Sequence, residues 1–106
     1  MRNSFICEVT FAALLIISKP AFAAPAPDLY QSKCTMCHGA DGRGDTPAGK
    51  AVKVHDFHSP AIVKMSNAEL IAITSAGKGK MPGYGGKLSG SEIESLVAHI
   101  RILQKK

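Results

Sequence analysis

The segment CTMCH at residues 34–38 limits what this chain of 106 residues can fold into more than any other part of it. Cys34 and Cys37 are separated by two residues, and His38 follows directly. The only other cysteine, Cys7, falls in a segment with the marks of a removable leader. Small exported domains need a staple, because one modest core barely offsets the entropy of the chain. Two cysteines so close together form no disulfide framework, so the staple must be a bound group.

The first 23 residues carry the pattern of a secretory signal peptide. Arg2 gives a basic start, an apolar run of nine residues follows at 9–17, and Ala21-Phe22-Ala23 ends the segment. A membrane-spanning helix needs roughly 20 apolar residues, so the run is too short to be one. We expect cleavage of residues 1–23, export to the periplasm or an equivalent extracytoplasmic compartment, and one mature domain at residues 24–106. The alternative is an uncleaved N-terminal anchor.

The mature domain is mildly basic. Its formal charge is +4, because loss of Arg2, Lys19 and Glu8 reduces the +5 of the full chain by one. The chain has no tryptophan and no basic run interleaved with aromatic residues, which argues against nucleic-acid binding. A mildly basic surface suits an acidic protein partner, or peripheral contact with an anionic membrane.

Three segments have the capping signals or apolar periodicity of helices. The first helix is expected from Asp28, as its N-cap, to the CTMCH segment. The second begins at the capping box Ser66–Glu69 and ends at Gly77. The third begins at a second capping box, Ser89–Glu92. Its apolar stripe consists of Ile93, Leu96, Val97, Ile100 and Leu103.

The segments between the predicted helices are rich in glycine. Residues 39–49 and 77–90 are therefore expected to be loops. No stretch alternates convincingly between apolar and polar residues as a half-buried strand does. The predicted fold class is all-α, with three to four helices. Long loops are unusual in so short a domain unless they wrap a large apolar group.

CTMCH is compatible with several chemistries. A thioredoxin-like dithiol begins a helix that follows a strand, and an all-α chain has no such setting. Structural zinc needs four ligands, and His55 or His58 belongs to no second pair of the right spacing. A Cys34–Cys37 disulfide would close a tiny loop and stabilise little. Cys-x-x-Cys-His is the attachment sequence of c-type haem, in which both thiols form thioethers and His38 binds the iron. We therefore expect one covalently attached haem c.

An electron-transfer haem needs a second axial ligand on its other face. Methionine is the usual one, and it raises the reduction potential relative to a second histidine. We assign Met81, which lies in the second glycine-rich loop. Met36 lies between the cysteines and cannot reach the opposite face, whereas Met65 is expected to pack at the start of the second helix. The nitrogen alternatives are His55, His58 and His99.

The stretches CTMCHGADGRG, KMPGYGGKLS and SEIESLVAHIRIL, in this order, resemble a class I c-type cytochrome of the short bacterial monohaem type. The resemblance covers essentially the whole mature chain. It implies the cytochrome c fold, with crossing N- and C-terminal helices and loops around one haem. It also implies that His38 and Met81 are the axial ligands. A further implication is that a proline carbonyl holds the His38 ring, with Pro47 as the candidate.

Aromatic residues depart from the family pattern at two places. The family commonly has an aromatic residue in the last helix that meets the first helix, and His99 stands at that place. Tyr30 would be the remaining aromatic residue of this contact. The common tryptophan of the family is absent. Tyr84 is expected either to cover the haem face near Met81 or to be an exposed loop residue.

Together these features predict a soluble, monomeric electron carrier that passes single electrons between exported or membrane-bound redox proteins. Two filled axial positions leave no site for a substrate, so we expect no enzyme activity. Lys78, Lys80 and Lys87 flank Met81 and are expected to face acidic partners. The alternatives are a haem c subunit of a larger oxidase or dehydrogenase complex, and a haem protein that binds a small ligand.

Overall fold

The computed structural model describes residues 12–16 and 24–106. Most of the predicted leader, residues 1–23, lies outside the described residues, so its cleavage stays a prediction. Residues 12–16 form no helix or strand and are exposed. In the described ranges, no helix has the length and apolar character needed to cross a membrane. The helices in these ranges are α1 (Ala26–Lys33), α2 (Thr35–His38), α3 (Pro47–Val52), α4 (Pro60–Val63), α5 (Asn67–Ala76) and α6 (Gly90–Gln104).

The two predicted capping boxes are confirmed. At α5, the Ser66 hydroxyl accepts from the Glu69 N–H at 3.1 Å, and the Glu69 carboxylate accepts from the Ser66 N–H at 3.0 Å. Ser89 and Glu92 repeat both bonds at α6. Each box satisfies backbone donors that a helix start otherwise leaves free. Gly77 ends α5 at a positive φ of 80°, as the sequence predicts.

The start of the first helix is a correction. Pro25 occupies the N-cap position and α1 begins at Ala26, so Asp28 lies inside the first turn. Pro27 lies in that turn as well, and proline is well suited there because its φ is already helical and it has no N–H to satisfy. A carboxylate in that turn is favoured by the helix dipole. Cys34 then separates α1 from the short α2.

Two short helices correct the predicted loops and the predicted number of helices. Helix α3 begins at Pro47, within the segment 39–49 that was expected to be loop. The Thr46 hydroxyl caps it by accepting from the Gly49 N–H at 2.9 Å. Helix α4 follows Ser59 and also has a proline in its first turn. Each helix begins with a hydroxyl residue at the N-cap followed by proline, Thr46-Pro47 in α3 and Ser59-Pro60 in α4. This helix-start signal outweighs the surrounding residues that suggest a loop.

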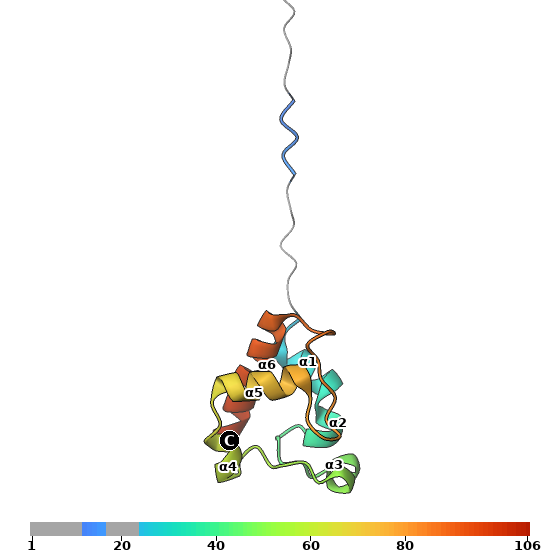
Figure 1. The fold of residues 1–106 in the computed structure, drawn as a ribbon, viewed down its shortest axis with the longest axis vertical. Coiled ribbons are helices and arrows are strands. Elements are labelled where there is room, and N and C mark those ends of the chain that lie inside the picture. Colours follow the sequence, from blue (N-terminus) through green and yellow to red (C-terminus); the bar gives the residue numbers. More distant parts are fainter. Residues whose placement is uncertain (1–11, 17–23) are drawn as a thin grey trace, which may run out of the picture.

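Helix α6 is the centre of the packing. It lies against both α1 and α5 (Figure 1). Its predicted stripe is confirmed, since Ile93, Leu96, Val97 and Leu103 are buried. The buried cluster at its centre contains Leu29, Tyr30, Phe57, Leu96 and Leu103.

His99 meets the N-terminal helix, as expected. Its ring centroid lies 4.9 Å from that of Tyr30, with the ring planes tilted by 48°. The contact between α1 and α6 therefore keeps an aromatic partner on each helix. Strands are absent from the described ranges, where the only ladder contact is an isolated bridge between Lys78 and Met81.

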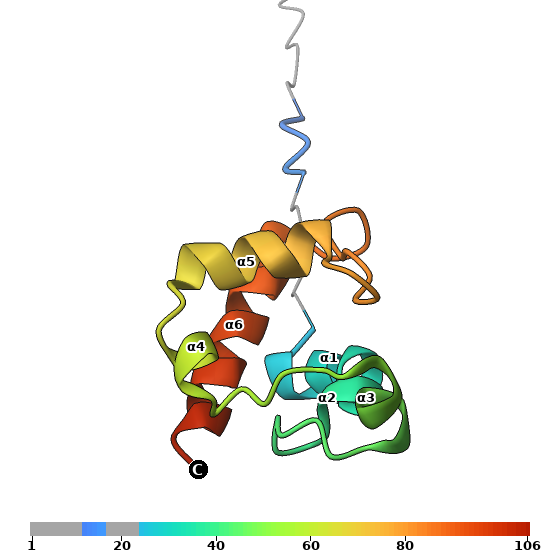
Figure 2. The ribbon, with the colours of Figure 1, turned by 60° about the horizontal axis from the view of Figure 1, so that its bottom comes forward.

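Figure 2 shows how the elements that line the site are grouped. Helices α1, α2 and α3 gather on one side, and α5 with the loop after it lies on the other. The chain between α3 and α4 passes alongside the first group. These segments surround the cavity described next.

Candidate functional site

A cavity of about 720 Å³ lies between the two groups of helices and contains most of the predicted site residues. Cys34, Cys37, His38, Met81 and Tyr84 all line it. The volume is in the range of sites that hold cofactors, which is about 300–1,000 Å³. The sequence therefore identified residues that the fold brings together from positions more than 40 apart in the chain.

The charge of the lining has one sign. The basic lining residues are Lys33, Lys53, Lys78, Lys80 and Lys87, and no aspartate or glutamate is among the described lining residues. The apolar lining includes Phe57, Ile62, Leu70, Ile73, Leu96 and Ile100. A largely apolar group with negative charges at its edge suits such a cavity.

The two thiols lie at the N-cap of α2, Cys34, and within it, Cys37. Cys34 and Cys37 are both partly buried and are not joined to each other. Burial raises the pKa of the Cys34 thiol to about 11, so this sulfur is held as a neutral thiol. Tyr30 on α1 fixes the end of the CTMCH segment, because its hydroxyl donates to the Gly39 carbonyl at 2.6 Å. Thr46 fixes it from α3, because its hydroxyl lies 2.8 Å from the Met36 carbonyl.

The alternatives to haem find little support in this geometry. In the described part of the chain, no three or more His, Cys, Asp or Glu side chains gather as a metal-binding group. A zinc site at CTMCH therefore lacks the further ligands it would need. A thioredoxin-like setting requires a strand before the motif, and α1 stands there instead.

The His38 imidazole is the unusual polar group of the cavity. Its Nδ1 is buried and has no hydrogen-bond partner, which holds for no other buried side-chain N or O atom of the described residues. Burial lowers the pKa of the ring, so the neutral form that ligates iron is favoured. The ring stacks on Phe57, with centroids 4.6 Å apart and planes 24° from parallel. Phe57 was not among the predicted site residues, and no local signal in the sequence marks it.

Pro47 is not among the residues lining the cavity. It is the exposed first residue of α3. In the described residues, His38 Nδ1 makes no hydrogen bond to the Pro47 carbonyl. The predicted role of Pro47 as the partner of the His38 ring stays a prediction.

Met81 is held in the cavity wall by a tight turn. Its N–H donates to the Lys78 carbonyl at 3.0 Å, and the Lys78 N–H donates to the Met81 carbonyl at 3.1 Å. Gly83 lets the loop return against α5, since a Cβ there would lie 2.7 Å from the Ala76 backbone. Met65 also lines the cavity, whereas Met36 does so from a position that is 77% exposed.

Tyr84 bridges the Met81 loop to α1. Its hydroxyl donates to the Lys33 carbonyl at 3.2 Å, and its N–H donates to the Thr74 carbonyl at 2.9 Å. Partial burial raises the pKa of the phenol, which stays protonated and able to donate. Of the two expectations for Tyr84, a wall of the cavity fits these contacts better than a free loop residue.

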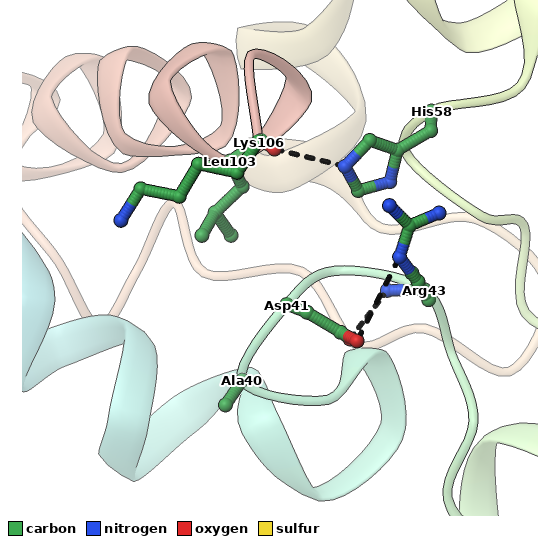
Figure 3. A pocket seen from close by; sticks show the side chains of 6 residues that line it. All are labelled: Ala40, Asp41, Arg43, His58, Leu103 and Lys106. Atoms are coloured by element: carbon green, nitrogen blue, oxygen red, sulfur yellow. Dashed lines mark hydrogen bonds and ion pairs between the residues drawn. The ribbon is translucent and has the colours of Figure 1, made fainter.

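The remaining histidines have different surroundings. His55 lines the cavity, whereas His58 does not. The Nδ1 of His58 lies 2.8 Å from Asp56 Oδ1, and its Nε2 lies 2.8 Å from the Leu103 carbonyl at the end of α6. Figure 3 shows this second bond at the edge of a smaller pocket of about 300 Å³. Arg43 also lines that pocket, where it lies 3.8 Å from both Asp41 and Asp56.

The residues present fit a covalently held haem. Cys34 and Cys37 line a cavity of suitable size, and the His38 imidazole lines it beside them, with its neutral form favoured because burial lowers the pKa of the ring. The Met81 thioether also lines it. Five lysines without a carboxylate suit the propionate groups that every haem carries. The kinds of donor atom present and the positive charge of the lining therefore both support haem as the bound group.

Comparisons with known proteins agree with this arrangement. The family model described as "Cytochrome C oxidase, cbb3-type, subunit III" matches residues 21–100. The cytochrome c6 of Nostoc sp. (strain PCC 7120 / SAG 25.82 / UTEX 2576) is 32% identical over 99 residues, which cover 90% of this chain and 82% of that protein. The cytochrome c6 of Synechococcus sp. (strain ATCC 27167 / PCC 6312) is 32% identical over 88 residues, covering 79% and 75%.

A solved structure gives the same likeness in three dimensions. The KustC0563 c-type cytochrome superposes with a TM-score of 0.70 and is 26% identical. The alignment covers 76% of this chain and 99% of that one. A point mutant of the same cytochrome superposes with a TM-score of 0.67.

Proposed function

Because this chain belongs to the class I c-type cytochromes, we propose that it carries single electrons through one haem c bound by thioethers at Cys34 and Cys37. The observation that carries the proposal is the cavity into which Cys34, Cys37, His38 and Met81 are brought together. Both thiols belong to the same short segment as His38, so attachment would hold this histidine at the iron.

The haem would supply the Fe(II)/Fe(III) couple, and the chain would supply what tunes it. His38 and Met81, which both line the cavity, are the proposed axial ligands. The Met81 thioether would raise the reduction potential relative to a nitrogen ligand. The apolar lining would exclude water from the metal. With both axial positions filled, we propose electron transfer without substrate chemistry, and hence no enzyme activity.

The proposed working place is the periplasm or an equivalent compartment. Support comes from the signal-peptide pattern at residues 1–23. We propose that the mature domain acts as a monomer between redox proteins.

The test of this function is one measurement on the exported protein. We expect an intact mass of residues 24–106 plus a single haem, together with a ferric spectrum that contains the near-infrared Met-to-iron charge-transfer band. Absence of the added haem mass would contradict attachment. Presence of the haem without that band would contradict ligation by Met81 and would favour the small-ligand-binding alternative.

The lysines around the cavity predict charge-dependent reactivity. We expect the Lys78→Glu/Lys80→Glu/Lys87→Glu variant to be oxidised by ferricyanide roughly tenfold more slowly at low ionic strength, because it loses attraction for the anionic reagent. The difference should shrink as salt is added, since salt screens exposed charges. Stopped-flow oxidation kinetics would measure both effects.

A matched control has the same net charge but leaves the cavity unchanged. Lys64→Glu/Lys105→Glu/Lys106→Glu reverses three charges at residues that do not line this cavity. We expect this control to react nearly as fast as the unmodified protein. Equal slowing of both triple variants would mean that total charge matters and that the Met81 loop is no docking surface.

A second candidate function is supported by the family model. Its description names a subunit of a cbb3-type cytochrome c oxidase, so the proposed haem could serve inside a larger complex. The two candidates differ in the native size of the haem-containing species. Elution of all haem c in the fraction of a membrane oxidase would favour the subunit, whereas elution at the mass of the free domain would favour the carrier.

A further inference from the structure

We propose that Phe57 is a positioning residue, whose ring sets the orientation of the His38 imidazole. The inference rests on the proposed function, because the imidazole plane has a consequence only when His38 is bound to iron. A histidine that ligates a metal is usually oriented by a hydrogen bond from its other ring nitrogen. Here the buried Nδ1 of His38 has no such partner among the described residues.

The contact between the two rings is a close stack. Their centroids lie 4.6 Å apart and their planes differ by 24°. Rotation of the imidazole about its Cβ–Cγ bond would drive its edge into the phenyl face. Stacked aromatic pairs are favourable beyond the apolar area that they bury. The stack therefore restrains the single torsion that a hydrogen bond at Nδ1 would otherwise restrain.

Phe57 can act in this way because it is itself fixed on several sides. Its side chain is 9% exposed and belongs to the central cluster. Its N–H donates to the Gly42 carbonyl at 2.9 Å, and its carbonyl accepts from Gln104 Nε2 at 2.9 Å. A Cβ at Gly42 would lie 2.5 Å from Phe57 Cδ2, so the phenyl ring lies directly on the Gly42 backbone. The ring has little room to shift.

The orientation of the imidazole plane has an electronic consequence. The π orbital of the ring overlaps with one of the iron d orbitals more than with the other, according to the angle of the plane. In the ferric state, this angle decides how unpaired spin spreads over the macrocycle. The paramagnetic shifts of the haem ring methyl groups report that distribution, and a buried residue that only adds stability would not change it.

The experiment compares the ferric holoproteins of Phe57→Leu and Phe57→Tyr with the unmodified protein by proton NMR. Phe57→Leu keeps an apolar side chain but removes the stack, so we expect the methyl resonances to change their spacing or order. Phe57→Tyr keeps the ring, and we expect it to restore the original pattern. An unchanged pattern in Phe57→Leu would overturn the proposal and favour the Pro47 carbonyl as the element that orients the imidazole.

The control is Leu29→Ala, which opens the same buried cluster at a residue that does not line the cavity. We expect it to lower the melting temperature while leaving the methyl pattern unchanged. A shift of the pattern in Leu29→Ala equal to that in Phe57→Leu would mean that loss of core packing alone explains the change, and would overturn the proposal.

A third variant tests the geometry if Phe57→Leu does not accumulate. Gly42→Ala keeps the Phe57 side chain chemically intact, but the added methyl group would press against the phenyl ring and displace it. The substitution also strains a backbone with φ of 76°. We expect a shifted methyl pattern, and an original pattern would overturn the proposal. The spectrum of the unmodified protein tests ligation by His38 and Met81, whereas the differences between variants test orientation. The two can therefore fail separately.

Discussion

Replacement of Met81 by alanine is expected to leave the haem attached and to remove the sixth ligand of its iron. The near-infrared Met-to-iron band should disappear. The reduction potential should fall by a substantial part of the range of about 0.8 V over which axial ligands set haem potentials. Cyanide or imidazole should then bind the ferric iron without having to displace a protein ligand. Optical spectroscopy and a redox titration would measure these effects together.

The other methionines of the mature chain provide the controls. Met36 is 77% exposed, and Met65 lines the cavity but lies before α5, outside the tight turn that holds Met81. We expect Met36→Ala and Met65→Ala to keep the band and to change the potential only slightly. Survival of the band in Met81→Ala with its loss in Met65→Ala would transfer the assignment to Met65.

Removal of both thiols should have the largest effect on stability. In Cys34→Ala/Cys37→Ala the haem can no longer be attached, and the domain would have to fold around a cavity of about 720 Å³. An unfilled cavity costs about 24 cal/mol per Å³, so even a third of this volume would cost roughly 6 kcal/mol. Domains are stable by only about 5–15 kcal/mol in total. We expect an exported chain that is largely unfolded.

Far-ultraviolet circular dichroism would measure the result as a loss of most of the helical signal. The matched control is Cys7→Ala, because Cys7 belongs to the predicted leader and should not affect the mature domain. Cooperative thermal unfolding of the double variant, with helical content close to that of the holoprotein, would contradict the view that the haem completes the core.

Local signals predicted the longer helices well. The boxes at Ser66 and Ser89 and the stripe of α6 are each encoded within a few residues, so neighbouring sequence is enough to place them. Helix α3 was missed because the glycines around it suggest a loop. Gly49 lies inside that helix for a tertiary reason, since a Cβ there would collide with the Cys37 carbonyl. No local pattern contains that information.

The candidate site divides in the same way. Cys34, Cys37 and His38 were predicted because haem attachment fixes their residue types and spacing within five residues. Met81 was predicted by comparison with the other methionines, and it lines the same cavity. Phe57 was not found, because its importance comes from a stack with a residue 19 positions away and from contacts with Gly42 and Gln104. Such a residue has the composition of any core position. Only the folded chain separates it from the others.

For the proposed export, the end of α6 would also set an order of events. Gln104 binds the Phe57 carbonyl, the Leu103 carbonyl accepts from His58, and Arg101 binds the Met65 carbonyl. Segments that line the cavity are thus fastened by the last turn of α6, which follows the two thiols by more than 60 residues and would therefore be translocated after them. A haem joined to the thiols early would wait in an open chain, and its pocket would close only after the final residues had arrived.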